Sequence, residues 1–245
     1  MMKNKILWAM ATALLFAHPA LAKTVVIAQD ATWPPMEFMN DKKEIVGLDA
    51  DYMKAVAKEA GFQVVLKNVA WDGIFAGLAS GKYDAVCSSV TITDERKKTM
   101  DFSLPYFKVR QALVVSKASN AKKLEDLKGK TLGGQIGTTG YLAIKKVEGI
   151  NAKSYDEIGL AMEDLFNGRI DGVVCDDPTA AQYALQKKEY AAKLKIASVL
   201  ETGDEWYGVA VKQGNKEILD LINKGIEAVQ KKEIDKKLRA KWIGK

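Results

Sequence analysis

The feature that most constrains the fold is an alternation of short apolar segments with longer segments that have the 3.6-residue period of a helix. The first series predicts strands over 24–29, 63–67 and 84–87 and helices over 48–60 and 71–79. Strands that alternate with helices form mostly parallel sheets covered by helices on both faces. The sequence therefore predicts an α/β fold.

A second series of the same kind follows residues 117–120. It predicts strands over 131–136 and 172–175 and helices over 138–147, 157–166 and 178–185. Residues 168–172 repeat the pattern of residues 81–85, because each segment starts with a glycine and a basic residue and leads into an apolar strand. We therefore expect two similarly built lobes.

Two strand-like segments, 111–116 and 206–211, border the second series. If both cross between the lobes, the C-terminal helices within 216–242 return to the first lobe and the two crossings form a hinge. The expected division is a first lobe over 23–110 and 208–245, a second lobe over 115–203, and hinge strands over 111–114 and 204–207.

The N-terminal 22 residues have the order of a secretory signal peptide. A basic start precedes an apolar run over 6–17, and Ala20-Leu21-Ala22 forms the small-residue exit. We expect cleavage after Ala22 and a mature chain that starts at Lys23 in the periplasm. No later stretch approaches the roughly 20 apolar residues of a transmembrane helix.

The single histidine of the sequence, His18, lies within this segment. The mature chain therefore lacks an imidazole, which excludes Ser-His and Cys-His nucleophile pairs and histidine-ligated metals. We expect neither a cofactor nor a metal. Carboxylate and lysine chemistry stay open.

The charge balance is modestly basic. The formal net charge of +6 includes Lys3 and Lys5, so the mature chain carries +4. Its lysines occur in scattered pairs beside acidic residues, which indicates a solvated surface rather than a nucleic-acid partner.

Cys87 and Cys175 form an even pair in an oxidising compartment, where a disulfide is chemically possible. Each follows a strand of a different expected lobe, however, and a bridge would lock the lobes together. We favour two buried free thiols.

A candidate carboxylate receptor follows the strand over 84–87. Ser88, Ser89 and Thr91 can present hydroxyls and backbone N–H groups, and the guanidinium of Arg96 matches two carboxylate oxygens. A plain strand-to-helix cap explains the same hydroxyl cluster. The receptor interpretation predicts that the chain binds an amino acid.

Several segments, in this order, resemble the periplasmic polar amino-acid-binding proteins of ABC importers, solute-binding protein family 3, which include lysine/arginine/ornithine-, histidine- and glutamine-binding proteins. They are residues 30–38, 47–51, 71–72, 88–96, 101–106, 137–139 and 169–177. The resemblance implies a two-lobed type II Venus flytrap with two hinge crossings, a monomer that closes over its ligand, and a membrane permease as partner.

The same resemblance implies roles for the groups that hold the amino-acid backbone. Arg96 and Thr91, with Thr139 from the second lobe, would hold the carboxylate, and Asp176 with Ser89 would hold the α-ammonium. Thr138 and Thr139 open a helix whose free N–H groups favour an anion, although an ordinary N-cap explains both.

Selection of the ligand side chain would fall to five residues: Asp30, Trp33, Asp49, Trp71 and Gln135. Two indoles can sandwich a guanidinium, and the aspartates add negative charge. Glutamine-binding proteins carry a lysine where this chain has Gln135 and a histidine where it has Cys175, which favours a cationic ligand here. We lean to arginine, lysine or ornithine, with glutamine or another neutral polar amino acid as the alternative. Either tryptophan can also be a core residue.

Transport is the preferred function, with two rivals. Cyclohexadienyl dehydratases share the implied fold, but they carry a catalytic glutamate where this chain has Thr179, so we expect no enzyme activity. A purely sensory role would use the same pocket as transport.

Overall fold

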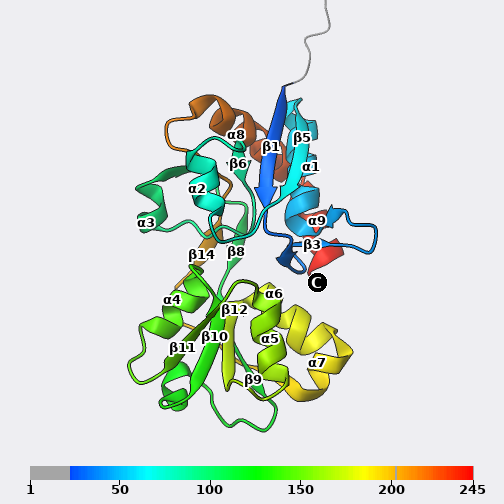
Figure 1. Ribbon diagram of the computed structural model, residues 1–245. Coiled ribbons are helices and arrows are strands. Elements are labelled where there is room, and N and C mark those ends of the chain that lie inside the picture. The colour runs from blue at the N-terminus through cyan, green and yellow to red at the C-terminus, as the bar shows by residue number, and fades with distance from the viewer. Residues whose placement is uncertain (1–22, 202, 245) are drawn as a thin grey trace, which may run out of the picture.

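The computed structural model describes residues 23–201 and 203–244, which fold into two lobes built on separate five-stranded sheets (Figure 1). The predicted signal peptide, residues 1–22, lies outside the described residues. Within the described part of the chain, no helix is both long and apolar enough to cross a membrane.

The first sheet has the order β5-β1-β6-β15-β7. Its strands are β1 (Thr24–Gln29), β5 (Gln63–Asn68), β6 (Ala85–Val86), β7 (Met100–Phe102) and β15 (Ala210–Lys212). The first three are parallel, as predicted, but β15 runs antiparallel to both of its neighbours. Because β7 is in turn antiparallel to β15, four of the five strands run in the same direction, and the prediction of a mostly parallel sheet holds.

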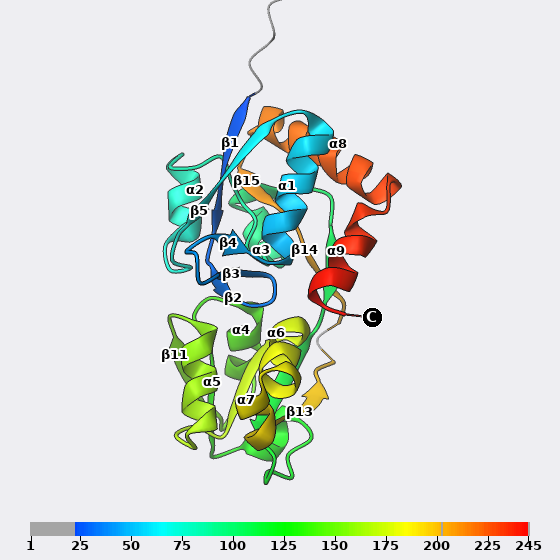
Figure 2. The same ribbon diagram turned by 90° about the vertical axis from the view of Figure 1, so that its right-hand side faces the viewer.

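Helices cover this sheet. They are α1 (Leu48–Ala60), α2 (Ile74–Ala79), α3 (Asp94–Lys97), α8 (Lys216–Lys231) and α9 (Ile234–Trp242). Gly61 ends α1 in a left-handed conformation, φ 83°, in which its N–H caps the carbonyl of Ala57. Helices α8 and α9 pack against α1, far from them in sequence (Figure 2).

The second sheet has the order β11-β10-β12-β9-β13. Its strands are β9 (Gln111–Ser116), β10 (Thr131–Gln135), β11 (Asn151–Tyr155), β12 (Gly172–Asp176) and β13 (Leu194–Val199). Three strands are parallel, and β9 is antiparallel to β12 and β13. Sequence patterns missed β11 because this edge strand is polar and mostly exposed.

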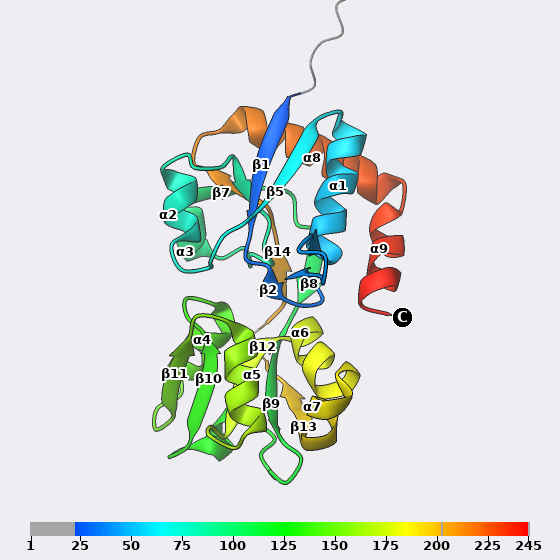
Figure 3. The same cartoon turned by 45° about the vertical axis from the view of Figure 1, so that its right-hand side comes forward.

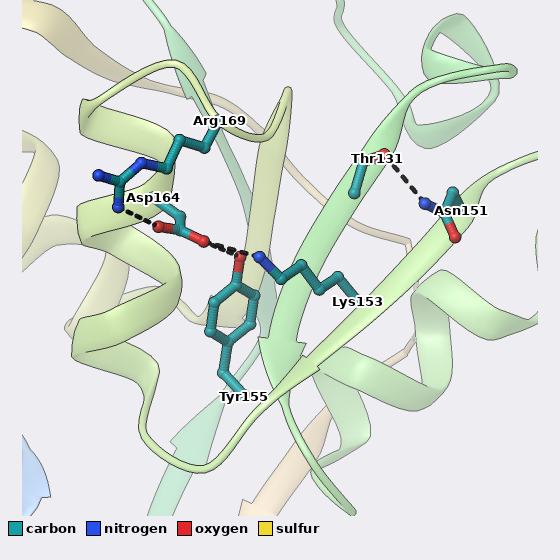
Figure 4. Close-up of polar contacts among 6 residues, drawn as sticks. All are labelled: Thr131, Asn151, Lys153, Tyr155, Asp164 and Arg169. Carbon is teal, nitrogen blue, oxygen red and sulfur yellow. Dashed lines mark hydrogen bonds and ion pairs between the residues drawn. The ribbon is translucent and has the colours of Figure 1, made fainter.

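The helical segments of the second lobe are a 3-10 turn (Leu124–Leu127), α4 (Thr139–Lys145), α5 (Ile158–Phe166), α6 (Asp177–Ala181), a π-helical turn (Gln182–Gln186) and α7 (Lys188–Lys193). The single helix predicted over 178–185 is thus α6 followed by the π-helical turn. On this lobe Asp164 of α5 accepts hydrogen bonds from Tyr155 and Lys153 of β11 and from Arg169 (Figure 4). These contacts connect the helix to the edge strand.

A two-stranded antiparallel ribbon joins the lobes, formed by β8 (Phe107–Val109) and β14 (Glu205–Tyr207). Residues 111–114, expected in a hinge strand, lie instead in β9, which is bonded on both sides within the second sheet. Residues 112–114 are apolar because that strand is buried. The crossing through β8 was not predicted, because Lys108 and Arg110 interrupt the apolar pattern there. The expected segment 204–207 overlaps β14.

The segment 206–211, predicted as one strand, is divided between β14 and β15. Gly208 lies at the break, where a Cβ atom would come within 2.8 Å of the Ile92 side chain.

A small three-stranded sheet lies between α1 and the second lobe (Figure 3). It contains β2 (Thr32–Trp33), β3 (Glu37–Met39) and β4 (Ile45–Val46). Sequence analysis did not predict it, because strands this short carry little periodicity. It brings Trp33 and Glu37 to the junction of the lobes.

Cys87 and Cys175 are both buried and free. Cys87 follows β6 of the first sheet, and Cys175 lies in β12 of the second. The prediction of two buried free thiols is confirmed.

Candidate functional site

A cavity with about 320 Å³ of space free of protein atoms, part of it open to solvent, lies between the two lobes. Its lining residues are polar or aromatic: Asp30, Trp33, Glu37, Trp71, Ser88, Ser89, Thr91, Arg96, Gln135, Thr138, Thr139 and Asp176. Eleven of these are among the twelve site residues expected from the sequence. Asp49 is the exception, and Glu37 was not expected.

Arg96 is a half-buried cation in the cavity wall. Its guanidinium donates to the carbonyl of Thr91 at 2.8 Å and to that of Gly137, in the second lobe, at 3.2 Å. The rings of Trp71 and Phe75 lie 5.5 and 5.2 Å from it. Burial lowers the pKa of Arg96 to about 10 against the opposing charges of nearby acids, so the side chain stays cationic at neutral pH.

Thr91 and the two serines take different positions in the wall. The backbone of Thr91 pairs with Tyr207 of the hinge ribbon. Ser88 and Ser89 turn their hydroxyls away from Arg96, toward Glu37, at 2.8 and 3.2 Å. Ser88 also accepts from the backbone N–H of Asp30.

Asp176 ends β12 and is buried in the cavity wall. Its carboxyl accepts from the Tyr207 hydroxyl at 2.5 Å and from the Gln111 amide at 2.6 Å. Burial raises the pKa of Asp176 to about 7, against the lowering effect of both hydrogen bonds. A cation beside this group would favour its charged form.

Thr138 and Thr139 both lie at the start of α4. Thr138 is the N-cap, since its hydroxyl accepts from the Tyr141 N–H. The ordinary N-cap given above as the alternative to anion binding therefore applies to Thr138. Thr139 instead donates to Glu205 of the hinge ribbon at 2.9 Å. Gly140 follows, where a Cβ atom would come within 2.7 Å of the Gln111 amide oxygen.

Asp30 and Gln135 make a direct contact between the lobes. The Gln135 amide donates to Asp30 at 2.8 Å and to the Asp156 carbonyl at 2.7 Å. Burial raises the pKa of Asp30, and the bond from Gln135 opposes this shift. Together with the contact between Arg96 and Gly137, this bond means that the lobes are closed on one another.

The two tryptophans face different surroundings. Trp33 is buried, and its indole N–H has no hydrogen-bond partner among the described residues. Trp71 packs edge-on against Phe75 and near Arg96. Part of the Trp71 surface is therefore occupied by the protein's own guanidinium.

Glu37 and Asp49 form a buried carboxyl pair, with exposed fractions of 1% and 0%. Asp49 lies behind the cavity wall, where it accepts from the backbone N–H of Ser89 and from Tyr106, each at 2.8 Å. Burial raises the pKa of Asp49 to about 6. Burial and then the charge of Asp49 raise the pKa of Glu37 well above its usual range.

Ser89 connects this pair through an uncommon backbone conformation. Its φ of 49° is left-handed, which few residues other than glycine adopt without strain. This conformation directs its N–H at Asp49 while its hydroxyl contacts Glu37. The hydrogen bonds to the carboxyl pair offset the strain.

Sequence reasoning missed two residues of the site. Glu37 stands between Met36 and Phe38, and an acid in an apolar run was the signal that could have identified it. Gln111 is fully buried and donates to Asp176. It stands at the start of an apolar strand, and nothing in the surrounding sequence marks it as a site residue.

Among residues 23–201 and 203–244, no group of three or more His, Cys, Asp or Glu side chains could hold a metal ion.

Residues 25–245 match the family of bacterial extracellular solute-binding proteins, family 3. The chain is 33% identical over 227 residues to a probable histidine-binding protein of Neisseria gonorrhoeae, which covers 91% of this chain and 84% of that protein. It is 33% identical over 248 residues to ABC transporter arginine-binding protein 1 of Escherichia coli (strain K12), which covers 99% of each.

A solved structure agrees with both relatives. An ancestral arginine-binding protein bound to arginine superposes with a TM-score of 0.86 at 41% identity, over 92% of this chain and all of that chain. All three proteins are named for binding an amino acid. With a two-lobed fold and a polar cavity between the lobes, this chain belongs to the bacterial extracellular solute-binding proteins of family 3.

Proposed function

We propose that this protein is the periplasmic receptor of an amino-acid ABC importer and that it binds an L-amino acid with a cationic side chain, arginine in preference. The observation that carries the proposal is the distribution of charge in the cavity. Arg96 lies near Asp176, whereas Glu37 lies near Asp30 and Asp49. The wall therefore offers one cationic group and two separate acidic groups to a ligand.

These charges complement those of arginine. The ligand carboxylate fits the guanidinium of Arg96, and its α-ammonium fits Asp176. Asp30 and Glu37 then remain for the guanidinium of the side chain. Hydrogen bonds to charged groups contribute roughly 1.5–3 kcal/mol each, so all three contacts favour tight binding.

Closure follows from the side of the cleft on which each group lies. Ser89, Thr91 and Arg96 belong to the first lobe, whereas Thr139 and Asp176 belong to the second. A ligand that reaches both sets stabilises the closed form over the open one. Trp33, with its free indole N–H, and Trp71 provide aromatic surface for the aliphatic stem and the guanidinium.

The relatives support the same ligand class. The Escherichia coli relative and the ancestral protein are both named as arginine-binding, and the Neisseria gonorrhoeae relative as probably histidine-binding. Each of those amino acids has a basic side chain.

A thermal-shift screen tests the ligand assignment. The mature chain is unfolded, stripped of ligand, refolded and mixed with the twenty L-amino acids, ornithine and citrulline. At about 100 times Kd we expect Tm to rise by about 5–10 °C with arginine, and less with lysine or ornithine. A shift confined to glutamine or another neutral amino acid would replace the cationic ligand with the neutral alternative, and no shift at all would contradict amino-acid binding.

Delivery to a membrane permease is the second part of the proposal. Export with cleavage after Ala22 and action as a monomer complete it. A strain that lacks the gene should fail to grow on arginine as sole nitrogen source and should recover with the intact gene. Normal growth combined with a lost chemotactic response would indicate a sensory role instead.

A further inference from the structure

The carboxyl pair of Glu37 and Asp49 is a buried acidic group without a cationic partner in the described part of the chain. Its contacts are to hydroxyls and a backbone N–H, from Ser88, Ser89 and Tyr106. The Ser89 hydroxyl lies 3.2 Å from Glu37 and 3.5 Å from Asp49, so the two carboxyls share one neighbour. One oxygen of Asp49, Oδ1, has no hydrogen-bond donor among the residues that the structure describes.

The two carboxyls differ in access to the ligand. Glu37 lines the cavity, whereas Asp49 lies behind it. When Glu37 is protonated, it donates a hydrogen bond to Asp49, which favours the proton on Glu37 and the charge on Asp49. Two charges that share one buried neighbour repel each other strongly, so the pair retains a proton to a higher pH than an isolated carboxyl does.

Other titratable groups surround the pair. Asp30, from the loop after β1, interacts with Glu37. So do Cys87 just after β6, Tyr106 just before β8 and Tyr207 in β14. Burial raises the pKa of the thiol and of both phenols, so these three stay neutral at physiological pH. Asp30 is therefore the neighbour whose effect on pH dependence must be distinguished from that of Glu37 by experiment.

The remaining charges of the cavity are Arg96 and Asp176. Asp176 titrates near neutral pH as well. It would act on the α-ammonium, which every amino-acid ligand carries, so its effect is common to all of them.

Building on the proposed function, we infer that the Glu37–Asp49 pair makes ligand choice depend on pH. With its proton, Glu37 presents an O–H to a neutral side chain. Without it, Glu37 presents a carboxylate to a guanidinium, which is always protonated. A cationic side chain displaces the proton to the buffer, and a neutral one leaves it in place.

The sign follows from linkage. Below the pKa of Glu37 in the free protein, arginine must release a proton to bind, so its affinity rises as pH rises, by up to about tenfold per pH unit. Above that pKa the gain ends. The affinity of a neutral ligand does not change with pH in this way, because the ligand leaves the proton on Glu37.

Arginine and citrulline are the matched probes, because they share the α-carboxylate, the α-ammonium and the aliphatic stem and differ in side-chain charge. Calorimetric titrations from pH 5 to 8.5, each in two buffers of different ionisation enthalpy, give affinity and proton release. We expect arginine to release up to about one proton more than citrulline, and the ratio of their affinities to rise with pH. Equal proton release and a constant ratio in the wild type would overturn the inference.

Variants assign the effect to residues. In Glu37→Gln the affinity ratio should become independent of pH. In Asp49→Asn the rise should move to lower pH, because Glu37 loses its charged neighbour. In Asp30→Asn the rise should persist, and its loss there with persistence in Glu37→Gln would assign the switch to Asp30 instead.

The wild-type proton count decides the question even if a variant does not fold. Failure of every amino acid to bind would contradict the proposed function. Binding of both probes with equal proton release would contradict the pH-dependent choice alone.

Discussion

Two carboxyl clusters of this protein have similar ingredients and opposite electrostatics. On the surface of the second lobe, Asp164 accepts from the Tyr155 hydroxyl at 2.7 Å and forms ion pairs with Lys153 and Arg169 (Figure 4). At the cleft, Asp49 accepts from a tyrosine hydroxyl at 2.8 Å but has Glu37 for a neighbour instead of a cation.

The pKa values follow this difference. The hydrogen bonds from Lys153 and Tyr155 lower the pKa of Asp164, whereas burial raises the pKa of Glu37 and Asp49. A carboxylate whose charge is balanced by its own chain serves the fold. A buried carboxyl without such a balance is left for a proton or for a cationic ligand.

We expect the largest effect when the cationic group of the cleft, Arg96, is removed. Arg96→Ala should weaken arginine binding about 30-fold or more, because loss of one partner of a buried charge pair costs about 2–5 kcal/mol. Arg169→Ala, which removes a cation from the Asp164 cluster, is the control and should leave the affinity unchanged. Near-normal affinity in Arg96→Ala, measured by calorimetry, would contradict the site assignment.

We expect the carboxyl of Glu37, and not that of Asp164, to affect ligand binding. Glu37→Gln should lower the affinity for arginine about 10- to 100-fold at pH 8, since a hydrogen bond to a charged group contributes about 1.5–3 kcal/mol. Asp164→Asn makes the equivalent change in the surface cluster and should not alter it. Equal affinities in wild type and Glu37→Gln would exclude a contact of Glu37 with the guanidinium.

The two clusters should also respond to pH in opposite directions in the ligand-free protein. The raised pKa of Glu37 means that the folded state holds a proton that the unfolded chain releases, so this group lowers stability as pH rises above about 4.3 toward its folded pKa. Urea unfolding at pH 5 and pH 8 should show Glu37→Gln to be more stable than wild type only at the higher pH. The opposite order at pH 8 would contradict the raised pKa.

For Asp164 the pKa is lowered on folding, so its contribution is present above about pH 4 and is lost as pH falls below that value. Asp164→Asn should cost about 1 kcal/mol at pH 7, or about 2–4 °C in Tm, because surface ion pairs are weak. The cost should disappear in acid. Glu163→Gln, at an exposed position on the same helix, is the control. An equal loss of stability in this variant would show that the Asp164 cluster contributes nothing specific.

The sequence predicted which residues line the cavity better than it predicted which residues cross between the lobes. Ser88, Gln135 and Asp176 come to one cavity because each stands at or just beyond a strand end, and strand ends of parallel units meet at one edge of a sheet. Residues 111–114 were expected in the hinge because a buried strand of the second sheet has the same apolar pattern as a strand that crosses between lobes. The real crossing, β8, is three residues long and carries an exposed lysine.

Asp49 and Glu37 show a second limit. Glu37 is the first residue of β3 and Asp49 lies in the first turn of α1, and no local pattern tells which of them faces the ligand. The choice depends on the short β2-β3-β4 sheet, which places Glu37 at the wall and leaves Asp49 behind it. Such depth is set by tertiary packing and has no signal in the sequence.

A crystal structure of the refolded protein with L-arginine tests the central claim most directly. The account predicts the α-carboxylate on Arg96, the α-ammonium on Asp176 and the guanidinium within roughly 2.7–3.2 Å of Glu37 or Asp30. A guanidinium directed away from both acids, or a ligand bound in the reverse orientation, would contradict it.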